Sequence, residues 1–251
     1  MTTILITGAS SGLGAEMARQ FAARGHDLAL AARRLDRLAE LRAEIQARHP
    51  ERRVEIRALD VTDDEQVFAV FRGFRDDFGA IGRVIVNAGL GKGAPIGTGR
   101  YDANKATAMT NFVAALAQCE AAMEIFRVQK HGHLVMISSM SAMRGMPKTI
   151  TTYAATKAGV AALAEGIRNE MAGEPALDID VSVIYPGYIR SEMNDKVKKP
   201  MPFMVDTPTG VAAIVEAIEK RRPHARVPTW PWVPLGTAMR HLPQQVLRRM
   251  M

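Results

Sequence analysis

The chain has 251 residues, of which 47% are apolar, so it is long enough for one large α/β domain with its own core. Its apolar runs are short, and none approaches the length of a membrane span. The net charge of +7 is confined to the C-terminal part: residues 196–251 carry ten Lys/Arg against three Asp/Glu, and residues 1–195 carry 23 of each sign. The excess of basic residues therefore belongs to the C-terminal part and gives no information about residues 1–195.

A single cysteine, Cys119, rules out an internal disulfide and fits a reducing compartment. The first residues, Thr3 to Thr7, already read as a buried strand, so we expect no signal or transit peptide ahead of the fold. Together these features favour a cytoplasmic enzyme.

Strand-like and helix-like segments alternate along the chain, which is typical of a parallel sheet with helices on both faces. Short apolar runs predict strands at 3–7, 27–31, 54–58, 83–86, 133–138 and 179–184, with a seventh candidate at 225–228. Amphipathic stretches predict helices at 13–24, 35–48, 64–78, 107–129, 153–172 and 208–221. Because no repeat or linker interrupts this alternation, we expect one doubly wound α/β domain of the Rossmann type over residues 1–251.

The first predicted strand runs into a glycine-rich turn and then a helix. The turn, Thr7–Gly14, contains Gly8, Gly12 and Gly14. Glycines here permit a tight turn and let the backbone approach a pyrophosphate at the helix N-terminus, where free N–H groups favour anions. The alternative is a purely structural turn between strand and helix.

The second predicted strand ends in Ala32-Arg33-Arg34. In a dinucleotide site, an acidic residue at this position binds the 2′-hydroxyl of the ribose, whereas an arginine accommodates a 2′-phosphate. Ala32 supplies no carboxylate and two guanidinium groups follow it, so NADP(H) is favoured over NAD(H). The alternative is that both arginines are solvated residues that open a helix.

Polar or small residues also follow the third, fourth and sixth predicted strands. Asp60 and Val61 follow the third strand, Asn87–Gly89 the fourth, and Tyr185–Ser191 the sixth. The carboxyl ends of parallel strands form the edge at which ligands bind in open α/β sheets. Asp60 has a second interpretation, as a cap for the next helix, and Asn111 on an apolar helix is on its own most often a satisfied core amide.

Three hydroxyl groups follow the fifth predicted strand, on Ser138, Ser139 and Ser141. They are either turn formers or donors to an oxyanion. His131 and His133 precede the same strand, and we interpret them as loop residues. A metal site would need further ligands around them, and we expect none.

Tyr153 and Lys157 lie four residues apart on a predicted helix and therefore share one face. A phenol has a usual pKa of about 10, and a fixed ammonium nearby lowers that pKa toward neutrality. The pair is a candidate proton donor and acceptor for a carbonyl or an alcohol. Taken alone, the pair is an ordinary helix surface.

In this combination the chain resembles the short-chain dehydrogenase/reductase family. The resemblance covers residues 1–191 and is specific as a joint pattern, although each part of it is common. The residues that carry it, all in order, are Gly8, Gly12, Gly14, Asp60, Asn87-Ala88-Gly89, Asn111, Ser139, Tyr153, Lys157 and Pro186-Gly187.

The resemblance implies hydride transfer between a nicotinamide and a ketone or secondary alcohol, with four residues in catalytic roles. Tyr153 would be the acid/base, and Lys157 would lower its pKa and hold the nicotinamide ribose. Ser139 would bond the reacting oxygen, with Ser141 and then Ser138 as weaker candidates. Asn111 would hold a water in a proton relay behind Lys157.

The resemblance also implies a binding site for NADP(H). Asp60 would meet the adenine, Asn87–Gly89 would lie along the cofactor, and Ile189 and Ser191 would contact its nicotinamide end. The full set expected to bind the cofactor is Gly8, Ser10, Ser11, Gly12, Leu13, Gly14, Arg33, Arg34, Asp60, Val61, Asn87, Ala88, Gly89, Tyr153, Lys157, Pro186, Gly187, Ile189 and Ser191.

Two departures from the family pattern stand out. Ser139 and Tyr153 are fourteen positions apart, one more than is commonest in the family. The segment 225–232 lacks the glycine pair that many members place in a tetramer interface. We expect a homodimer or a homotetramer: a dimer through the helices of Asn111 and Tyr153 fits the sequence, and the missing glycine pair argues against a tetramer formed by the usual route.

Residues 190–206 resemble the loop that covers substrate in this family, and their Met193, Met201, Phe203 and Met204 suit an adaptable apolar pocket. Residues 229–251 form a basic and apolar extension, which either packs on the domain or a partner subunit, or contacts a membrane surface. Both segments lead us to expect a hydrophobic small-molecule substrate.

Three other functions agree less well with the sequence. A non-catalytic dinucleotide sensor would have no need for Tyr153 and Lys157 aligned with Ser139 and Asn111. A nucleotide-sugar epimerase or dehydratase normally brings a larger C-terminal substrate domain and another glycine spacing. A nucleic-acid partner is not expected, because the basic tail carries no recognition motif.

Overall fold

The computed structural model describes residues 2–91, 93–192, 203–243, 245 and 246. Seven parallel strands form one sheet in the order β3-β2-β1-β4-β5-β6-β7. The strands are β1 (Thr3–Thr7), β2 (Asp27–Ala32), β3 (Val54–Ala58), β4 (Arg83–Val86), β5 (His131–Ile137), β6 (Asp178–Pro186) and β7 (His224–Val227). The single-domain α/β fold and the seventh strand are confirmed. The strand order reverses between β1 and β4, which opens a crevice at their carboxyl ends.

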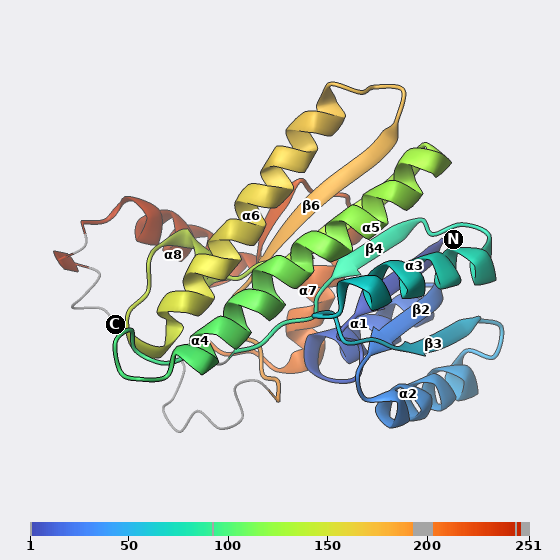
Figure 1. Cartoon of the computed structure of the whole chain (residues 1–251), viewed down its shortest axis with the longest axis horizontal. Helices are drawn as coiled ribbons and strands as arrows, with labels where there is room; N and C mark the ends of the chain where they lie inside the picture. The colour runs from blue at the N-terminus through green and yellow to red at the C-terminus, as the bar shows by residue number, and fades with distance from the viewer. Residues whose placement is uncertain (1, 92, 193–202, 244, 247–251) are drawn as a thin grey trace.

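Helices cover both faces of the sheet, as Figure 1 shows. They are α1 (Gly12–Ala23), α2 (Leu35–Arg48), α3 (Asp64–Phe78), α4 (Tyr101–Ala108), α5 (Ala114–Gln129), α6 (Thr151–Ala172), α7 (Thr207–Glu219) and α8 (Thr229–His241). Helices α3, α5 and α6 pack on one face and α1, α2 and α7 on the other.

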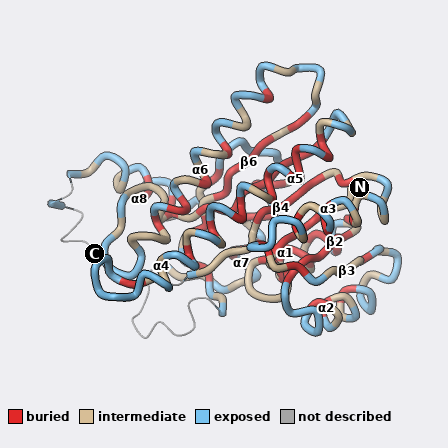
Figure 2. Tube along the Cα trace, viewed as in Figure 1, coloured by how far each residue is buried: buried red, intermediate tan, exposed pale blue. Residues whose placement is uncertain are grey.

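Alternation along the strands supplies both layers of the core. In β1, Leu5 faces α3 and α5, whereas Ile4 and Ile6 face α1 and α7, and all three are fully buried. Figure 2 shows the result, with buried residues along the strands and exposed residues on the outer sides of the helices. Because both faces are covered, the central strands β1, β2 and β4 are mostly apolar, as TILIT, DLALAA and RVIV show.

The helix predicted at 107–129 differs from the observed one. It begins at Tyr101 as α4, passes through a π-helical turn at Met109–Val113, and continues as α5. Asn111 lies in this turn, and its side chain bonds the backbone of Leu90. Turns of this kind are frequent at functional sites.

The interpretation of His131 and His133 as loop residues is wrong, because both belong to β5. His133 is fully buried, its Nε2 lies 2.8 Å from Ser182 Oγ, and Arg83 Nε donates to its Nδ1 at 3.0 Å. Burial lowers the pKa of His133 to about 3, so the ring is neutral. The part of the chain that the structure describes holds no cluster of three His, Cys, Asp or Glu side chains suited to a metal.

The C-terminal extension begins as a helix packed on its own domain. Trp232 in α8 is 4% exposed, and its ring meets Tyr188 edge-on at 5.2 Å between centroids. A Cβ added to Gly187 would lie 2.0 Å from Trp232 Cε2, so α8 sits directly over the turn after β6. Residues 244 and 247–251 of the extension lie outside the described residues. Among the described residues, no helix is both long and apolar enough to cross a bilayer.

Candidate active site

One cavity of about 980 Å³ lies at the carboxyl ends of the strands. Its walls come from the segments that follow β1 to β6 and from α8. Every residue predicted to bind the cofactor lines it, as do Ser139, Tyr153 and Lys157. Asn111 lies directly behind, since a Cβ added to Gly89 would be 3.3 Å from Asn111 Oδ1 and 3.6 Å from Lys157 Nζ.

The glycine turn after β1 has a shape that only glycines adopt easily. Gly8 and Gly12 have φ of +65° and +54°, in the left-handed region. A Cβ on Gly14 would lie 2.4 Å from the carbonyl oxygen of Gly8, which is closer than atoms approach. The N-terminus of α1 therefore borders the cavity without side chains in the way, and the turn fits the pyrophosphate of a dinucleotide.

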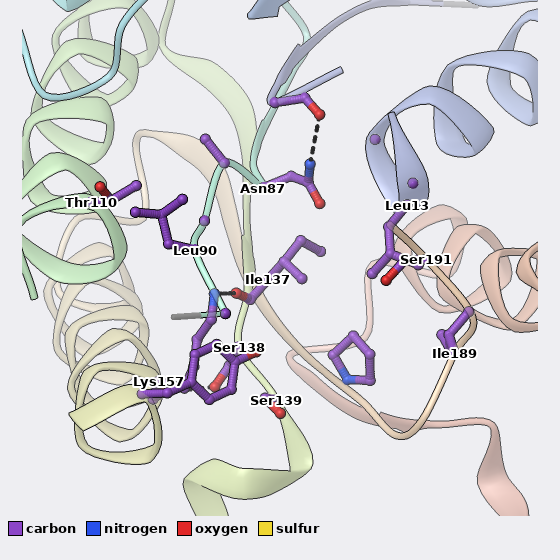
Figure 3. A pocket seen from close by; sticks show the side chains of 18 of the residues that line it. Leu13, Asn87, Leu90, Thr110, Ile137, Ser138, Ser139, Lys157, Ile189 and Ser191 are labelled. Carbon is purple, nitrogen blue, oxygen red and sulfur yellow. Dashed lines mark hydrogen bonds between the residues drawn. The ribbon is translucent and has the colours of Figure 1, made fainter. Parts of the chain in front are cut away.

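Asn87 fixes the glycine turn to the end of β4. Its Nδ2 donates to the carbonyl oxygen of Thr7 at 2.9 Å and to that of Gly8 at 3.4 Å, the second bond being drawn in Figure 3. Its backbone N–H donates to Thr7 Oγ1 at 3.1 Å. The N–H of Ala88 shares the same hydroxyl at 3.2 Å. These bonds hold the two sides of the crevice at the point where the strand order reverses.

Arg34 reaches back over the glycine turn from the end of β2. Its Nε lies 3.2 Å from Ser10 Oγ and its Nη2 lies 2.6 Å from Ser11 Oγ. A guanidinium beside two hydroxyls is the donor set that binds a phosphate. The predicted residues at this end of the cavity are therefore brought together, and they suit the 2′-phosphate of NADP(H).

Asp60 is not the cap of α3, because Asp63 accepts from the N–H of Gln66 at 3.0 Å in that role. Asp60 instead accepts from the N–H and the hydroxyl of Thr62, at 3.0 and 2.8 Å. The N–H of Thr62 is the main cause that lowers the pKa of Asp60, and the charge of Arg33 adds to it. Asp60 is thus an ionised acceptor at the edge of the cavity.

Tyr153 and Lys157 differ electrostatically from the sequence-based prediction. Burial raises the pKa of Tyr153, and the opposing effect is a hydrogen bond from Ser139 rather than the charge of Lys157. Lys157 Nζ lies 5.9 Å from the centre of the Tyr153 ring and donates to the carbonyl oxygen of Ile137 at 2.8 Å. The carbonyl thus anchors the ammonium, and Tyr153 is a protonated phenol in this structure.

The three serines after β5 have separate roles. Ser138 Oγ donates to the carbonyl oxygen of Lys157 at 2.7 Å, and Ser141 Oγ donates to Ser139 Oγ at 3.0 Å. The Ser139 oxygen accepts a hydrogen bond from Ser141, so the hydroxyl proton of Ser139 is free to point away from Ser141. The Ser139 hydroxyl is hydrogen-bonded to Tyr153. Among the three, this geometry favours Ser139 as the donor to a reacting oxygen. In Figure 3, Ser138, Ser139 and Lys157 lie across the cavity from Leu13.

Two asparagines attach the loop after β4 to the helices beside it. Asn111 accepts from the N–H of Leu90 at 2.7 Å and donates to its carbonyl at 2.9 Å. Asn104 likewise accepts from the N–H of Ala94 and donates to its carbonyl oxygen, both at 3.1 Å. Its Oδ1 also accepts from Thr152 Oγ1 at 3.1 Å. No motif in the sequence indicated Asn104, whose only signal is its position seven residues before Asn111.

A family model described as short chain dehydrogenase matches residues 2–202. The chain belongs to this family. The resemblance read from its motifs is therefore confirmed.

Relatives of this short-chain dehydrogenase span nearly the same length. An uncharacterised oxidoreductase of Mycobacterium tuberculosis is 54% identical, over 98% of this chain and 96% of the relative. A short-chain dehydrogenase from Sphingobium yanoikuyae, solved in complex with NADPH, superimposes with a TM-score of 0.82 at 28% identity, covering 100% and 96% of the two chains. The bulky-bulky ketone specific alcohol dehydrogenase from Comamonas testosteroni gives a TM-score of 0.80 at 27% identity, covering 100% and 95%.

The cavity of this short-chain dehydrogenase has an apolar end, only part of which was predicted from the sequence. Tyr188, Phe203, Trp232, Leu235 and Met239 reach it from the segments after β6 and from α8. The further apolar residues lining the cavity that no motif indicated are Leu59, Leu90, Ala106, Met109, Met140, Met146 and Ile150.

Only part of the predicted substrate-covering loop can be compared with the structure. Residues 190–192 and 203–206 are described, whereas Met193 and Met201 lie outside the described residues. Ile189 pairs with Val205 in a parallel bridge, which joins the two ends of the loop. Glu192 also lines the cavity, and no motif in the sequence indicated it.

Proposed function

We propose that this short-chain dehydrogenase uses NADP(H) to interconvert an apolar ketone and its secondary alcohol. One observation carries the proposal: the hydrogen-bonded hydroxyls of Tyr153 and Ser139 line the same cavity as the glycine turn of Gly8–Gly14. A proton donor, a polarising donor and a dinucleotide cradle in one cavity are the parts that carbonyl reduction requires.

Tyr153 acts as the acid when the ketone is reduced and as the base when the alcohol is oxidised. A bound nicotinamide would supply or accept the hydride. Because the phenol is protonated, it can give its proton to the oxygen of the substrate without a prior change of state. Ser139 donates a hydrogen bond to the same oxygen and stabilises the negative charge that develops there.

Lys157 positions the cofactor through its ammonium group. Its ammonium group is held beside Gly89 and the end of β5, where the nicotinamide ribose would lie against it. Asn111 holds the backbone of Leu90, so we assign its side chain to maintaining this wall of the cavity. The remaining predicted residues, Pro186, Gly187, Ile189 and Ser191, line the same cavity, and we propose that Ile189 and Ser191 contact the nicotinamide end.

The assignment of NADP(H) rests on Arg34 with Ser10 and Ser11, and on Ala32 in place of an acidic residue. The Sphingobium yanoikuyae relative was solved with NADPH, so a protein of this fold can hold that cofactor, but the choice of NADP(H) here rests on the residues named above. Arg33 adds a second positive charge near Asp60. We expect NADPH to bind more tightly than NADH.

The apolar end of the cavity supports a hydrophobic substrate. Trp232, Leu235 and Met239 from α8 face it together with Tyr188 and Phe203. The ketone-specific relative from Comamonas testosteroni, described as acting on bulky-bulky ketones, supports a large substrate. We therefore propose ketones with two sizeable apolar groups, of lipid-, steroid- or ketoacyl-like character, as the substrate class.

The protein is proposed to act in the cytoplasm as a homodimer through α5 and α6. Phe112, Val113 and Leu116 are exposed by 37 to 39% on the outer side of the helix that carries Asn111. An apolar stripe of this kind is more stable when a second copy covers it. A homotetramer is the alternative, and sedimentation would separate the two.

Turnover of a ketone panel with NADPH and with NADH tests this function. We expect NADPH oxidation with bulky aryl or cyclic ketones and little with small polar sugars. Efficient reduction of sugars without reduction of any lipid or steroid ketone would contradict the substrate class. Failure to oxidise either cofactor with any carbonyl compound would contradict the enzymatic proposal.

A further inference from the structure

The carboxylate of Glu192 contacts two arginines at the end of the cavity that we assign to the 2′-phosphate. Its Oε2 accepts from Nη1 and Nη2 of Arg34, both at 3.2 Å, and its Oε1 accepts from Arg37 Nη1 at 3.1 Å. Ser11 also hydrogen-bonds this carboxylate. An anion is therefore held by two guanidinium groups and a hydroxyl, from the segment after β2, from α2 and from the glycine turn.

These contacts match the chemistry that a phosphate would require. Guanidinium groups bind phosphate and carboxylate oxygens in the same fork geometry, and a hydroxyl completes either set. Arg34 and Ser11 are the residues assigned above to the 2′-phosphate of NADP(H). The carboxylate of Glu192 thus takes the place of phosphate oxygens on the same donors.

Glu192 and a 2′-phosphate cannot use these donors together. Two anions a few ångströms apart repel each other, and each guanidinium edge can serve only one of them. The carboxylate must leave Arg34 and Arg37 before the phosphate pairs with them. An NAD(H) ribose, which has no phosphate, does not require this exchange.

We propose that Glu192 is an internal competitor of the 2′-phosphate and that Arg37 is a second arginine of the phosphate site. Glu192 thereby weakens NADP(H) more than NAD(H) and sets the margin by which the protein distinguishes the two cofactors. This inference rests on the proposed function, because it takes the 2′-phosphate site at Arg34 as given.

The expected effect of Glu192 on NADPH affinity depends on how far its contacts are exposed to water. The side chains of Arg34, Arg37 and Glu192 are 43%, 48% and 47% exposed, so water screens the contacts. Exposed ion pairs of this kind change equilibria by about 2- to 5-fold, and removing a charge beside the bound phosphate adds to that. We expect Glu192→Gln to tighten NADPH binding by about 3- to 10-fold.

The test is an isothermal calorimetric titration of the purified protein with each of NADPH, NADH, 2′-AMP and 5′-AMP. Glu192→Gln should tighten NADPH and 2′-AMP by the stated factor and change NADH and 5′-AMP by less than about 2-fold. The gain should shrink as salt is added, because the contacts are exposed. The matched control is Glu55→Gln, which breaks the exposed pair with Arg53 at the amino end of β3 and should change none of the four affinities.

Unchanged or weaker NADPH binding by Glu192→Gln, or an equal gain for NADH, would overturn the inference. Arg34→Ala and Arg37→Ala separate this failure from a failure of the proposed function. Loss of 2′-AMP affinity in Arg34→Ala without a gain in Glu192→Gln would refute only the competitor. Full 2′-AMP affinity in Arg34→Ala would refute the phosphate site itself, and full affinity in Arg37→Ala would remove Arg37 from it.

Discussion

Lys157 donates a hydrogen bond from its ammonium group to the carbonyl oxygen of Ile137, 2.8 Å away. The bond joins α6 to the last residue of β5, and the lysine is only 6% exposed. Burial lowers the pKa of Lys157 from its usual 10.5 to about 8. The ammonium group that we propose to hold the nicotinamide ribose is therefore kept in place at a cost to the stability of the fold.

This cost predicts a pH dependence of stability. Between about pH 8 and 10.5, the folded chain has lost the Lys157 proton and the unfolded chain still binds it. The unfolded state binds more protons, so the contribution of Lys157 to the free energy of unfolding rises with pH across this window. The slope from this one group is about 1.4 kcal/mol per pH unit.

Urea unfolding of the wild type and of Lys157→Met, compared across this pH window, would measure the effect. The wild type should gain stability relative to the variant as pH rises through the window, and the two should run in parallel below about pH 8. Parallel curves throughout would mean that the lysine titrates normally in the folded protein.

The serines after β5 give a prediction that separates catalysis from packing. Ser139→Ala should lower kcat/KM for ketone reduction by about 100-fold, because the developing oxyanion loses a donor, with little change in melting temperature. Ser138→Ala should instead destabilise the fold by about 1 kcal/mol, because it removes the buried bond to the Lys157 carbonyl. Steady-state kinetics and thermal melts on both variants distinguish the roles. Equal kinetic losses in the two would contradict the assignment of Ser139.

The close contact between Gly187 and Trp232 predicts that α8 moves when Gly187 gains a side chain. In Gly187→Ala, the new Cβ would lie 2.0 Å from Trp232 Cε2, so the indole or the turn must move. Overpacking of this kind costs about 1–3 kcal/mol, and the displaced Trp232 should shift its fluorescence toward that of a solvated indole. Gly166→Ala in α6 is the control, because its Cβ would meet open space among the described residues. That variant should gain up to about 1 kcal/mol, and a similar loss in both would refute the packing argument.

Local patterns explain most of what could be predicted from the sequence. The glycine turn of Gly8–Gly14 and the four-residue spacing of Tyr153 and Lys157 depend on neighbours in the chain, so their elements could be assigned directly. The carboxyl ends of parallel strands meet at one edge, so the residues that follow each strand could be expected to line a common cavity.

Long-range partners explain what could not be predicted. The Lys157 ammonium was expected to act on Tyr153, but it is anchored by Ile137, on a separate element. Glu192 meets Arg34 from 158 positions away, and His133 in β5 is satisfied by Arg83 in β4 and Ser182 in β6. No spacing in the sequence encodes such contacts, because they depend on how the strands are ordered in the sheet.

The proton of Tyr153 is the central element of the proposed chemistry, and Tyr153→Phe tests it most directly. This variant keeps the ring, so NADPH should bind within about 2-fold of the wild type by fluorescence titration, while general acid catalysis is lost. Single-turnover reduction of a bulky ketone should then slow by about 100- to 10,000-fold. A variant that binds NADPH and reduces the ketone at the wild-type rate would show that another group supplies the proton and would contradict the account.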